Sequence, residues 1–140
     1  MGGLIAFGEF AEVFRGLLWG SKVAVKQLKL RGTSEGLLMA LRHEVGIMAS
    51  LRHPHVLTLI GSLEDRSQPC IVLEYMQGTL YELAHEQHRQ RWKSDRSSML
   101  AQLLAHLSDV VSGCAYLHGR APAVLHRDLK PPNILFDENL

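Results

Sequence analysis

The spacing of apolar residues changes at Gly78, and this change separates two regions with different predicted secondary structure. In the first region, residues 4–30 contain three short β-favouring pieces, LIAF, EVFRGLLW and KVAVKQLKL. Gly8, Gly16 and Gly20 punctuate these pieces and favour turns. The pattern predicts a meander of strands with two hairpins.

A helix and two more strands complete the first region. After Gly32, apolar residues recur every three or four positions, at 37, 38, 41, 45, 48 and 51, which predicts an amphipathic helix. Thr33 or Ser34 can cap its start, and Pro54 prevents it from continuing. VLTLIGSLE and PCIVLEYM then indicate two further strands. The first region is therefore expected to hold five strands and one helix.

The second region is expected to be mainly helical. Residues 79–93 are polar and charge-rich, and they fit either a helix or a loop. The following stretch, SSMLAQLLAHLSDVVSGCAYLH, carries an apolar stripe from Leu100 to Leu117 at helical spacing. Only about twenty residues follow it, too few to cover so long an apolar face. We therefore expect this stripe to be exposed and the 140-residue chain to be poorly soluble.

Composition limits the classes of function. The 140 residues are 46% apolar and 21% charged, enough for one folded domain with a core. A net charge of +1 gives no reason to expect a nucleic-acid partner. Cys70 and Cys114 fit neither a disulfide framework nor a paired metal motif, which favours a reducing compartment. The amino end shows no signal peptide or membrane anchor, so the cytoplasm is the expected location.

Two nucleotide or metal motifs are not matched. The phosphate-binding pattern G-x-x-x-x-G-K-[ST] does not occur in the sequence. HEQH, residues 85–88, differs from the zinc motif H-E-x-x-H because its second histidine comes one position early. Residues 85–88 are better explained as a solvent-exposed stretch.

Five motifs, in this order, resemble the eukaryotic protein kinase family, and the resemblance covers the whole chain. They are IAFGEFAEVFRG (5–16), VAVK (23–26), Glu44 in HEVGIMASLRHPHV, IVLEYMQGTL (71–80) and HRDLKPPN (126–133). The last matches the family's catalytic loop, H-R-D-L-x-x-x-N, at every specified position and is the most specific of the five.

The resemblance implies an α+β, protein-kinase-like fold. Residues 1–75 would form the N-lobe, a five-stranded antiparallel sheet with one helix, and residues 76–140 the hinge and the first part of a helical C-lobe. ATP and Mg²⁺ are the implied cofactors, with ATP held between the lobes.

The first motif departs from the family pattern G-x-G-x-x-G-x-V. Aligned on Val13, the three glycine positions are Ala6, Gly8 and Ala11, so one glycine remains. The family uses backbone amides of this turn to reach phosphate oxygens, and a Cβ at such a position stiffens the turn or pushes the nucleotide away. Taken by itself, the stretch is better explained by a plain hairpin turn.

The next three motifs carry the remaining residues implied in nucleotide binding. In the family, the residue matching Lys26 pairs with the α- and β-phosphates, Glu44 holds that lysine, and Ala24 contacts the adenine. Backbone groups near Glu74 and Met76 would hydrogen-bond the adenine edge. Without the other motifs, each of these residues would be an ordinary surface or strand residue.

The catalytic loop supplies the chemistry. The resemblance implies that Asp128 accepts the proton of the substrate hydroxyl, that Asn133 binds a magnesium ion and that Lys130 approaches the transferred phosphate. Lys130 also favours Ser or Thr as the substrate residue. The apolar pairs that flank the loop, 124–125 and 134–135, are predicted to be short strands that fix it to the core.

The sequence ends at FDENL, before the D-F-G motif that gives the family its second magnesium carboxylate. We therefore expect the isolated 140-residue polypeptide to transfer little or no phosphate. The alternative function is that of a pseudokinase or non-catalytic interaction fragment, which the two alanines at glycine positions favour and the retained Lys26, Glu44, Asp128 and Asn133 oppose. The sequence leaves the protein substrate and the oligomeric state open.

Overall fold

The computed structural model describes residues 2–29, 35–65, 67–90 and 96–137. The chain forms two compact units. The first comprises Met1–Arg52 and Val56–Tyr75, and the second comprises His53–His55 and Met76–Leu140. Each unit is described here by itself.

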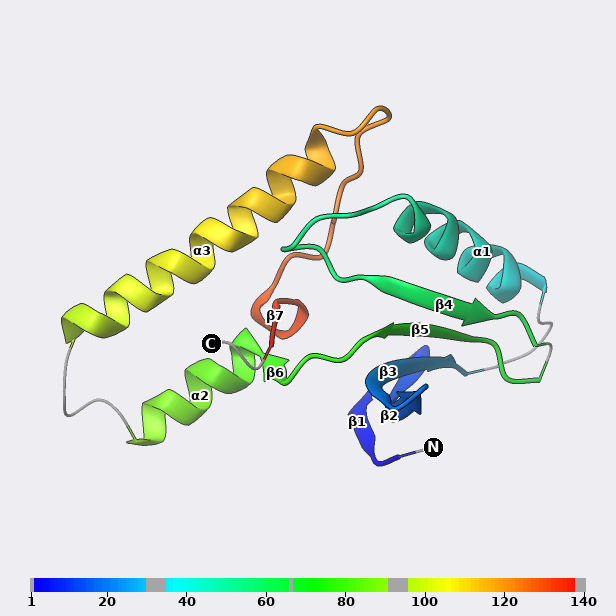
Figure 1. Cartoon of the computed structure of the whole chain (residues 1–140), viewed down its shortest axis with the longest axis horizontal. Coiled ribbons are helices and arrows are strands. Elements are labelled where there is room, and N and C mark those ends of the chain that lie inside the picture. The colour runs from blue at the N-terminus through cyan, green and yellow to red at the C-terminus, as the bar shows by residue number, and fades with distance from the viewer. Residues whose placement is uncertain (1, 30–34, 66, 91–95, 138–140) are drawn as a thin grey trace. The chain divides into compact units, whose positions relative to one another are not determined.

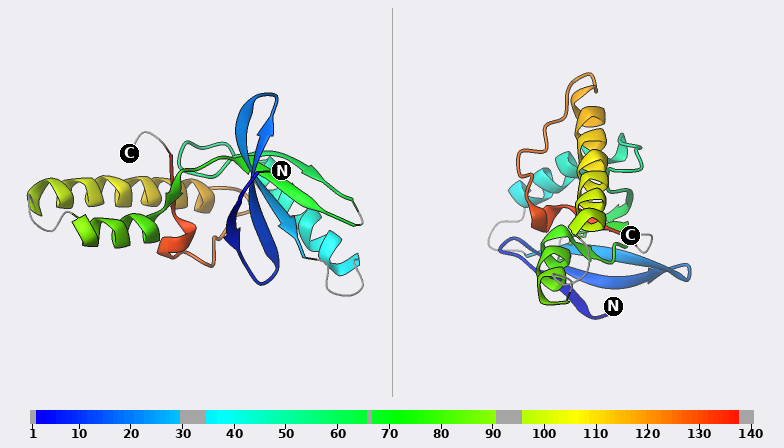
Figure 2. Two further views of the ribbon diagram at one scale, coloured as in Figure 1. Left: turned by 90° about the horizontal axis from the view of Figure 1, so that it is seen from below. Right: turned by 90° about the vertical axis from the view of Figure 1, so that its left-hand side faces the viewer.

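The first unit is built on a five-stranded antiparallel sheet with the order β1-β2-β3-β5-β4 (Figure 1). The sheet twists strongly, so that β1 to β3 run at a steep angle to β4 and β5 (Figure 2). The bounds of the strands are Leu4–Phe7 (β1), Ala11–Leu18 (β2), Ser21–Leu28 (β3), Leu59–Leu63 (β4) and Cys70–Glu74 (β5). All five strands expected from the sequence are present, and the predicted α+β fold class is confirmed.

The hairpin between β2 and β3 turns on two residues with positive φ, Trp19 (49°) and Gly20 (85°). Two such residues between paired strands make the tight turn that matches the twist of the flanking strands. The sequence places Trp19 in the second strand, but in the structure it lies in this turn. The fourth strand is also shorter than predicted, because it begins at Leu59 rather than near Val56.

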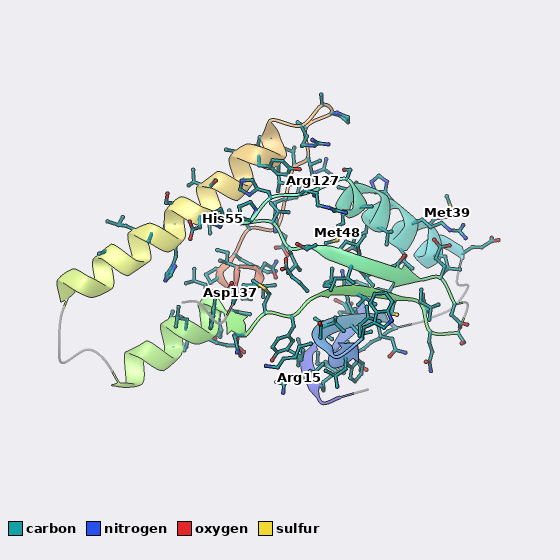
Figure 3. The ribbon with its side chains drawn as sticks, viewed as in Figure 1. Arg15, Met39, Met48, His55, Arg127 and Asp137 are labelled. Carbon is teal, nitrogen blue, oxygen red and sulfur yellow. The ribbon has the colours of Figure 1, made fainter. Side chains whose placement is uncertain are left out.

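Helix α1 (Glu35–Ala49) lies along β4 and covers the sheet (Figure 1). Leu38 and Leu41 on its inner face join Ile71 and Leu73 of β5 in the core of the unit. Met48 also packs against this core, whereas Met39 is 68% exposed (Figure 3). The apolar spacing that predicted the helix is therefore confirmed by its packing.

The ends of α1 differ from the prediction at one residue. Leu51 was expected to continue the helical stripe, but the helix ends at Ala49 and Leu51 is buried just beyond it. The amide groups of Ser50 and Leu51 bond three residues back, to Ile47 and Met48, which tightens the last turn. The expected caps, Thr33 and Ser34, lie outside the described residues.

The second unit contains two helices and a small two-stranded sheet. Its elements are β6 (Gly78–Thr79), α2 (Leu80–Gln90), α3 (Arg96–His118), the 3₁₀ turn η1 (Pro131–Asn133) and β7 (Leu135–Phe136). Of the two structures that residues 79–93 allowed, the helix forms. Thr79 and Glu82 close its first turn reciprocally: the Glu82 amide donates to Thr79 Oγ1 at 3.2 Å, and the Thr79 amide donates to Glu82 Oε2 at 2.8 Å.

Strands β6 and β7 bring distant parts of the sequence together. Gly78 pairs with Phe136 and Thr79 with Leu135. A Cβ at Gly78 would lie 2.9 Å from the tip of the Phe136 ring, so any other residue there would require the ring to shift. The pairing therefore holds the segment that follows residues 126–133 beside the start of α2.

Residues 53–55 pack on the carboxyl-terminal half of α3 (Figure 3). The His53 ring stacks on Tyr116 with centroids 4.8 Å apart, and His55 Nε2 lies 3.5 Å from Asp109 Oδ1. The His55 carbonyl oxygen lies 2.5 Å from where a Cβ at Gly113 would stand. Only a glycine allows the segment to approach the helix this closely.

The apolar stripe of α3 is partly exposed, as expected. Leu104, Leu107 and Val111 are exposed by 58%, 45% and 66%, but Leu117 is buried. The side chains of Leu100 and Leu103 lie outside the described residues. The prediction therefore holds for the middle of the stripe and fails at its carboxyl end, where the chain turns back and the Val124 amide donates to the Leu117 carbonyl.

Candidate functional site

Lys26 and Glu44 form the ion pair that the family resemblance implied. Lys26 Nζ on β3 lies 2.7 Å from Glu44 Oε1 on α1. The side chains of Lys26 and Glu44 are 30% and 43% exposed to solvent. Solvent screening therefore limits the contribution of the pair to stability to about 1 kcal/mol or less. The main effect of the pair is positional, since it holds a mobile ammonium group at one place beside the sheet.

The strand register places three of the expected residues on one face of the sheet. Val13 on β2 is paired with Lys26, and Lys26 and Ala24 are two residues apart on β3. Paired residues and residues two apart lie on the same face. Ala24 is paired with Leu73 and packs against the core, so this is the face that α1 covers.

The turn between β1 and β2 holds Gly8. The Gly8 amide donates to the Ala11 carbonyl at 2.9 Å, and a Cβ at Gly8 would lie 3.2 Å from that oxygen. Ala6 and Ala11, which stand at the other two glycine positions, are strand residues paired with Val13 and Leu28. The turn is thus a tight hairpin whose outer positions already belong to the sheet.

Glu74, at the end of β5, is held by Thr58. The Glu74 amide donates to the Thr58 carbonyl at 3.1 Å, and the Glu74 carboxylate accepts the Thr58 amide at 2.5 Å. The Glu74 amide and carboxylate are therefore both engaged by the backbone of Thr58. The next residue, Tyr75, accepts a hydrogen bond from Arg15 Nη2 at 2.9 Å, with the guanidinium carbon 5.2 Å from the ring centroid.

Arg15, Thr58 and Tyr75 were not predicted as parts of the site. Their contacts fix the residues immediately before Met76, where the sequence suggested adenine recognition by the backbone. Arg15 lies on an alternating strand and Thr58 before one, and such positions carry no local pattern that marks a partner so distant in the sequence. Only the register of the folded sheet brings them to β5.

The catalytic-loop residues of the second unit form one cluster. The Asn133 Nδ2 group donates to the backbone carbonyl of Asp128 at 2.9 Å and to its Oδ2 atom at 2.8 Å. Lys130 Nζ lies 2.9 Å from the same Oδ2 atom. A single carboxylate oxygen therefore contacts both the amide group of Asn133 and the ammonium group of Lys130.

The backbone of the loop explains how these side chains converge. The 3₁₀ turn η1 begins after Lys130 with two prolines and brings Asn133 back toward Asp128. Arg127 has a φ of 61°, a left-handed conformation that is uncommon for a residue with a long side chain. The His126 ring nitrogen Nδ1 accepts the Asp128 amide at 3.4 Å.

The cluster lowers the pKa of Asp128 below its usual value. The Lys130 hydrogen bond is the main cause, the Asn133 hydrogen bond and the charges of Lys130 and His126 add to it, and partial desolvation opposes it. The carboxylate is exposed to solvent and stays ionised at neutral pH. It can therefore accept a proton or contact a cation.

One expectation about the loop was wrong. Val124 and Leu125 were predicted to form a short strand, but the structure has no strand over residues 121–130. Val124 instead bonds to the end of α3, and Leu125 is 55% exposed. On the other side only Leu135 is in a strand, since Ile134 ends the 3₁₀ turn.

A known protein family matches almost the whole of this sequence. The protein kinase domain family matches residues 2–140. This chain belongs to the protein kinase family. Residues 126–133 and the Lys26–Glu44 pair lie within the matched residues.

Several named proteins are similar to this kinase chain. The probable serine/threonine-protein kinase drkB of Dictyostelium discoideum is 39% identical over 137 residues, which are 96% of this chain and 19% of that protein. From Arabidopsis thaliana, the probable serine/threonine-protein kinase SIS8 is 36% identical over 99% of this chain and 13% of its own length. Serine/threonine-protein kinase CTR1 of the same plant is 36% identical over 96% of this chain and 16% of its own length. The kinase chain thus spans a fifth or less of these relatives.

Three further observations concern the described part of this kinase chain. No three or more of its His, Cys, Asp and Glu side chains gather as a metal-binding group. No helix in the part of the chain that the structure describes is long and apolar enough to span a membrane. Cys70 and Cys114 are free thiols, and burial raises the pKa of the Cys70 thiol.

Proposed function

We propose that the protein containing this chain transfers the γ-phosphoryl group of ATP to Ser or Thr hydroxyls of protein substrates. The observation that carries the proposal is the cluster at Asp128, where an ionised carboxylate is held by Lys130 and Asn133. The names of the similar proteins, which are serine/threonine-protein kinases, support the class of substrate.

Asp128 is proposed to accept the proton of the attacking hydroxyl. Its carboxylate has one oxygen engaged by Lys130 and Asn133, which leaves the other as the acceptor for a hydroxyl. Phosphoryl transfer depends mainly on positioning and on neutralising charge, so a fixed carboxylate is what the reaction needs from this residue. Lys130 is proposed to carry its positive charge toward the transferred phosphate.

The first unit is proposed to bind the nucleotide. Lys26, held by Glu44, would contact the α- and β-phosphates, because a compact ammonium group suits phosphate oxygens. Ala24 and Val13 lie on the same sheet face as Lys26, and they would offer an apolar surface to the adenine ring. Gly8 in the β1–β2 turn and the backbone at Glu74 and Met76 complete the predicted contacts.

The residues of the catalytic loop fit a magnesium ion. Asn133 uses its Nδ2 group for both contacts to Asp128, so its amide oxygen is turned away from them. Amide and carboxylate oxygens are the ligands that Mg²⁺ prefers. When bound, the ion would neutralise charge on the phosphates. The family's second magnesium carboxylate is not among residues 1–140, and we therefore keep the prediction that these residues alone transfer little or no phosphate.

The test is transfer of labelled γ-phosphate from ATP to a Ser- and Thr-containing protein by the full protein. We expect phosphoserine or phosphothreonine with the wild type and roughly a hundredfold less with Lys26→Met. Arg42→Met is the matched control, since it removes an exposed cation of the same unit that pairs with Glu64. Wild-type transfer that Lys26→Met leaves unchanged would contradict the proposal.

A second candidate function is non-catalytic, as in a pseudokinase. The observation in its favour is the β1–β2 turn, in which Ala6 and Ala11 replace glycines and the Gly8 amide is bonded within the turn. Titration of the full protein with ATP and magnesium, followed by its unfolding temperature, separates the two candidates. A rise in unfolding temperature supports the kinase, and an unchanged temperature supports the interaction role. The cytoplasm remains the predicted location, supported by the two free thiols.

A further inference from the structure

Lys29, just after β3, makes more contacts with the β1–β2 turn than its position in the sequence suggests. Its Nζ atom donates to the Gly8 carbonyl at 2.9 Å and lies 3.3 Å from Glu12 Oε1. The same atom stands 3.2 Å from the centroid of the Phe7 ring. One ammonium group therefore contacts the residue before the turn, the turn itself and the strand after it.

The backbone of Lys29 adds a further bond to the turn. Its amide donates to the Phe10 carbonyl at 2.9 Å, next to the Gly8–Ala11 bond that closes the turn from inside. The Lys29 side chain is 19% exposed, less than the 30% of Lys26. A lysine that only faced solvent would leave more of its stem uncovered, so this side chain is engaged along its length.

The turn held in this way is the one expected to meet the phosphates. A turn with three glycines is flexible, and its ordering around a ligand has an entropic cost. Here two of the three positions are alanines in paired strands, and the third is tied through its carbonyl to Lys29. The bond uses the Gly8 carbonyl oxygen, an acceptor that would repel a phosphate if it pointed outward.

We propose that Lys29 is a positioning residue that preorganises the Phe7–Glu12 turn for the phosphates of the nucleotide. Its ammonium group hydrogen-bonds the partially negative Gly8 carbonyl oxygen and pairs with the Glu12 carboxylate, and so lowers the repulsion of both toward a polyanion. This inference rests on the proposed binding of ATP. Lys29 itself touches the turn, whereas Lys26 is the proposed phosphate contact.

The test compares ATP with adenosine as ligands of the full protein, using Lys29→Met, which keeps the length of the side chain and removes its charge. Adenosine has no phosphates, so loss of Lys29 should weaken ATP binding roughly tenfold and leave adenosine binding nearly unchanged. Lys29→Arg should restore most of the ATP affinity, because it keeps the cation beside Glu12 and the Phe7 ring. Arg42→Met is the matched control for removal of a cation and should change neither affinity.

A second readout does not require a nucleotide. Amide hydrogen exchange at residues 8–11 should become faster in Lys29→Met without ligand and stay at the wild-type rate in Arg42→Met. Glu12→Gln, which keeps Lys29 but removes its anionic partner, should show a smaller increase, and it serves if Lys29→Met fails to fold.

The outcomes separate the two claims. If the wild type binds neither ligand, the proposed nucleotide binding is wrong, and the exchange rates alone decide whether Lys29 holds the turn. If the wild type binds ATP and Lys29→Met binds it equally well, the role of Lys29 is refuted while ATP binding stands. Equal weakening of ATP and adenosine would also refute it, since it would indicate a general structural defect.

Discussion

Replacing Gly113 by Ala tests the packing of residues 53–55 on α3. The new Cβ would stand 2.5 Å from the His55 carbonyl oxygen and 3.3 Å from its carbon, and real Cβ atoms essentially never approach an atom closer than 3.0 Å. The obstacle is backbone, so it cannot rotate away as a side chain would. Overpacking of this kind costs about 1–3 kcal/mol.

The same substitution has an opposing effect, because Ala favours a helix interior over Gly by about 1 kcal/mol. We therefore expect Gly113→Ala to lower the free energy of unfolding by up to about 2 kcal/mol, as the difference of the two effects. Gly46→Ala is the matched control: Gly46 also lies inside a helix, but nothing stands within 4 Å of its Cβ position. It should raise the free energy of unfolding by about 1 kcal/mol.

Urea denaturation of the two variants and the wild type measures these changes. The two variants should therefore differ by about 1–3 kcal/mol, with Gly46→Ala the more stable of the two. If Gly113→Ala is as stabilising as Gly46→Ala, the close contact between His55 and α3 is wrong.

Two further predictions concern the second unit. Lys130→Met removes the main cause of the lowered pKa of Asp128, so the pKa of that carboxyl should rise toward its ordinary value in an NMR titration, and an unchanged or lower pKa would argue against the Lys130 contact. Because the folded-state pKa of Asp128 is lowered, its contribution to stability is present above the unfolded pKa and is lost as the pH falls through the folded value. Thr79→Ala removes the reciprocal cap with Glu82 and should destabilise the unit by about 1 kcal/mol, whereas no loss in thermal or urea unfolding would show that the cap is unimportant.

Patterns within single elements made much of the fold predictable. The alternating strands, the turns at Gly8 and Gly20 and the helical spacing of apolar residues in α1 were local signals, and the structure contains the elements they predicted. The turn expected at Gly16 was wrong, because Gly16 lies inside β2 and pairs with Val23. Thr79 and Glu82 also carried a local capping signal, which would have decided between helix and loop for the stretch that follows.

Contacts between distant residues were less accessible. Lys26 and Glu44 could be paired in advance because they lie in a family motif, and the pair is present. Lys29 lies outside the motifs, and Arg15 follows the last specified position of the first motif, so their contacts depend on the register of the sheet. Val124 was misassigned for the same reason, since an apolar pair becomes a strand only where a partner strand is available.

The most direct test of the account is the rate of phosphate transfer by the full protein when Asp128 is replaced by Asn. We expect the turnover rate to fall roughly a hundredfold or more while ATP affinity changes little, because Asn cannot accept the hydroxyl proton. Asp109→Asn on α3 is the matched control and should retain activity, since Asp109 contacts only His55 among the described ion pairs. An Asp128→Asn protein that transfers phosphate at the wild-type rate would contradict the central claim.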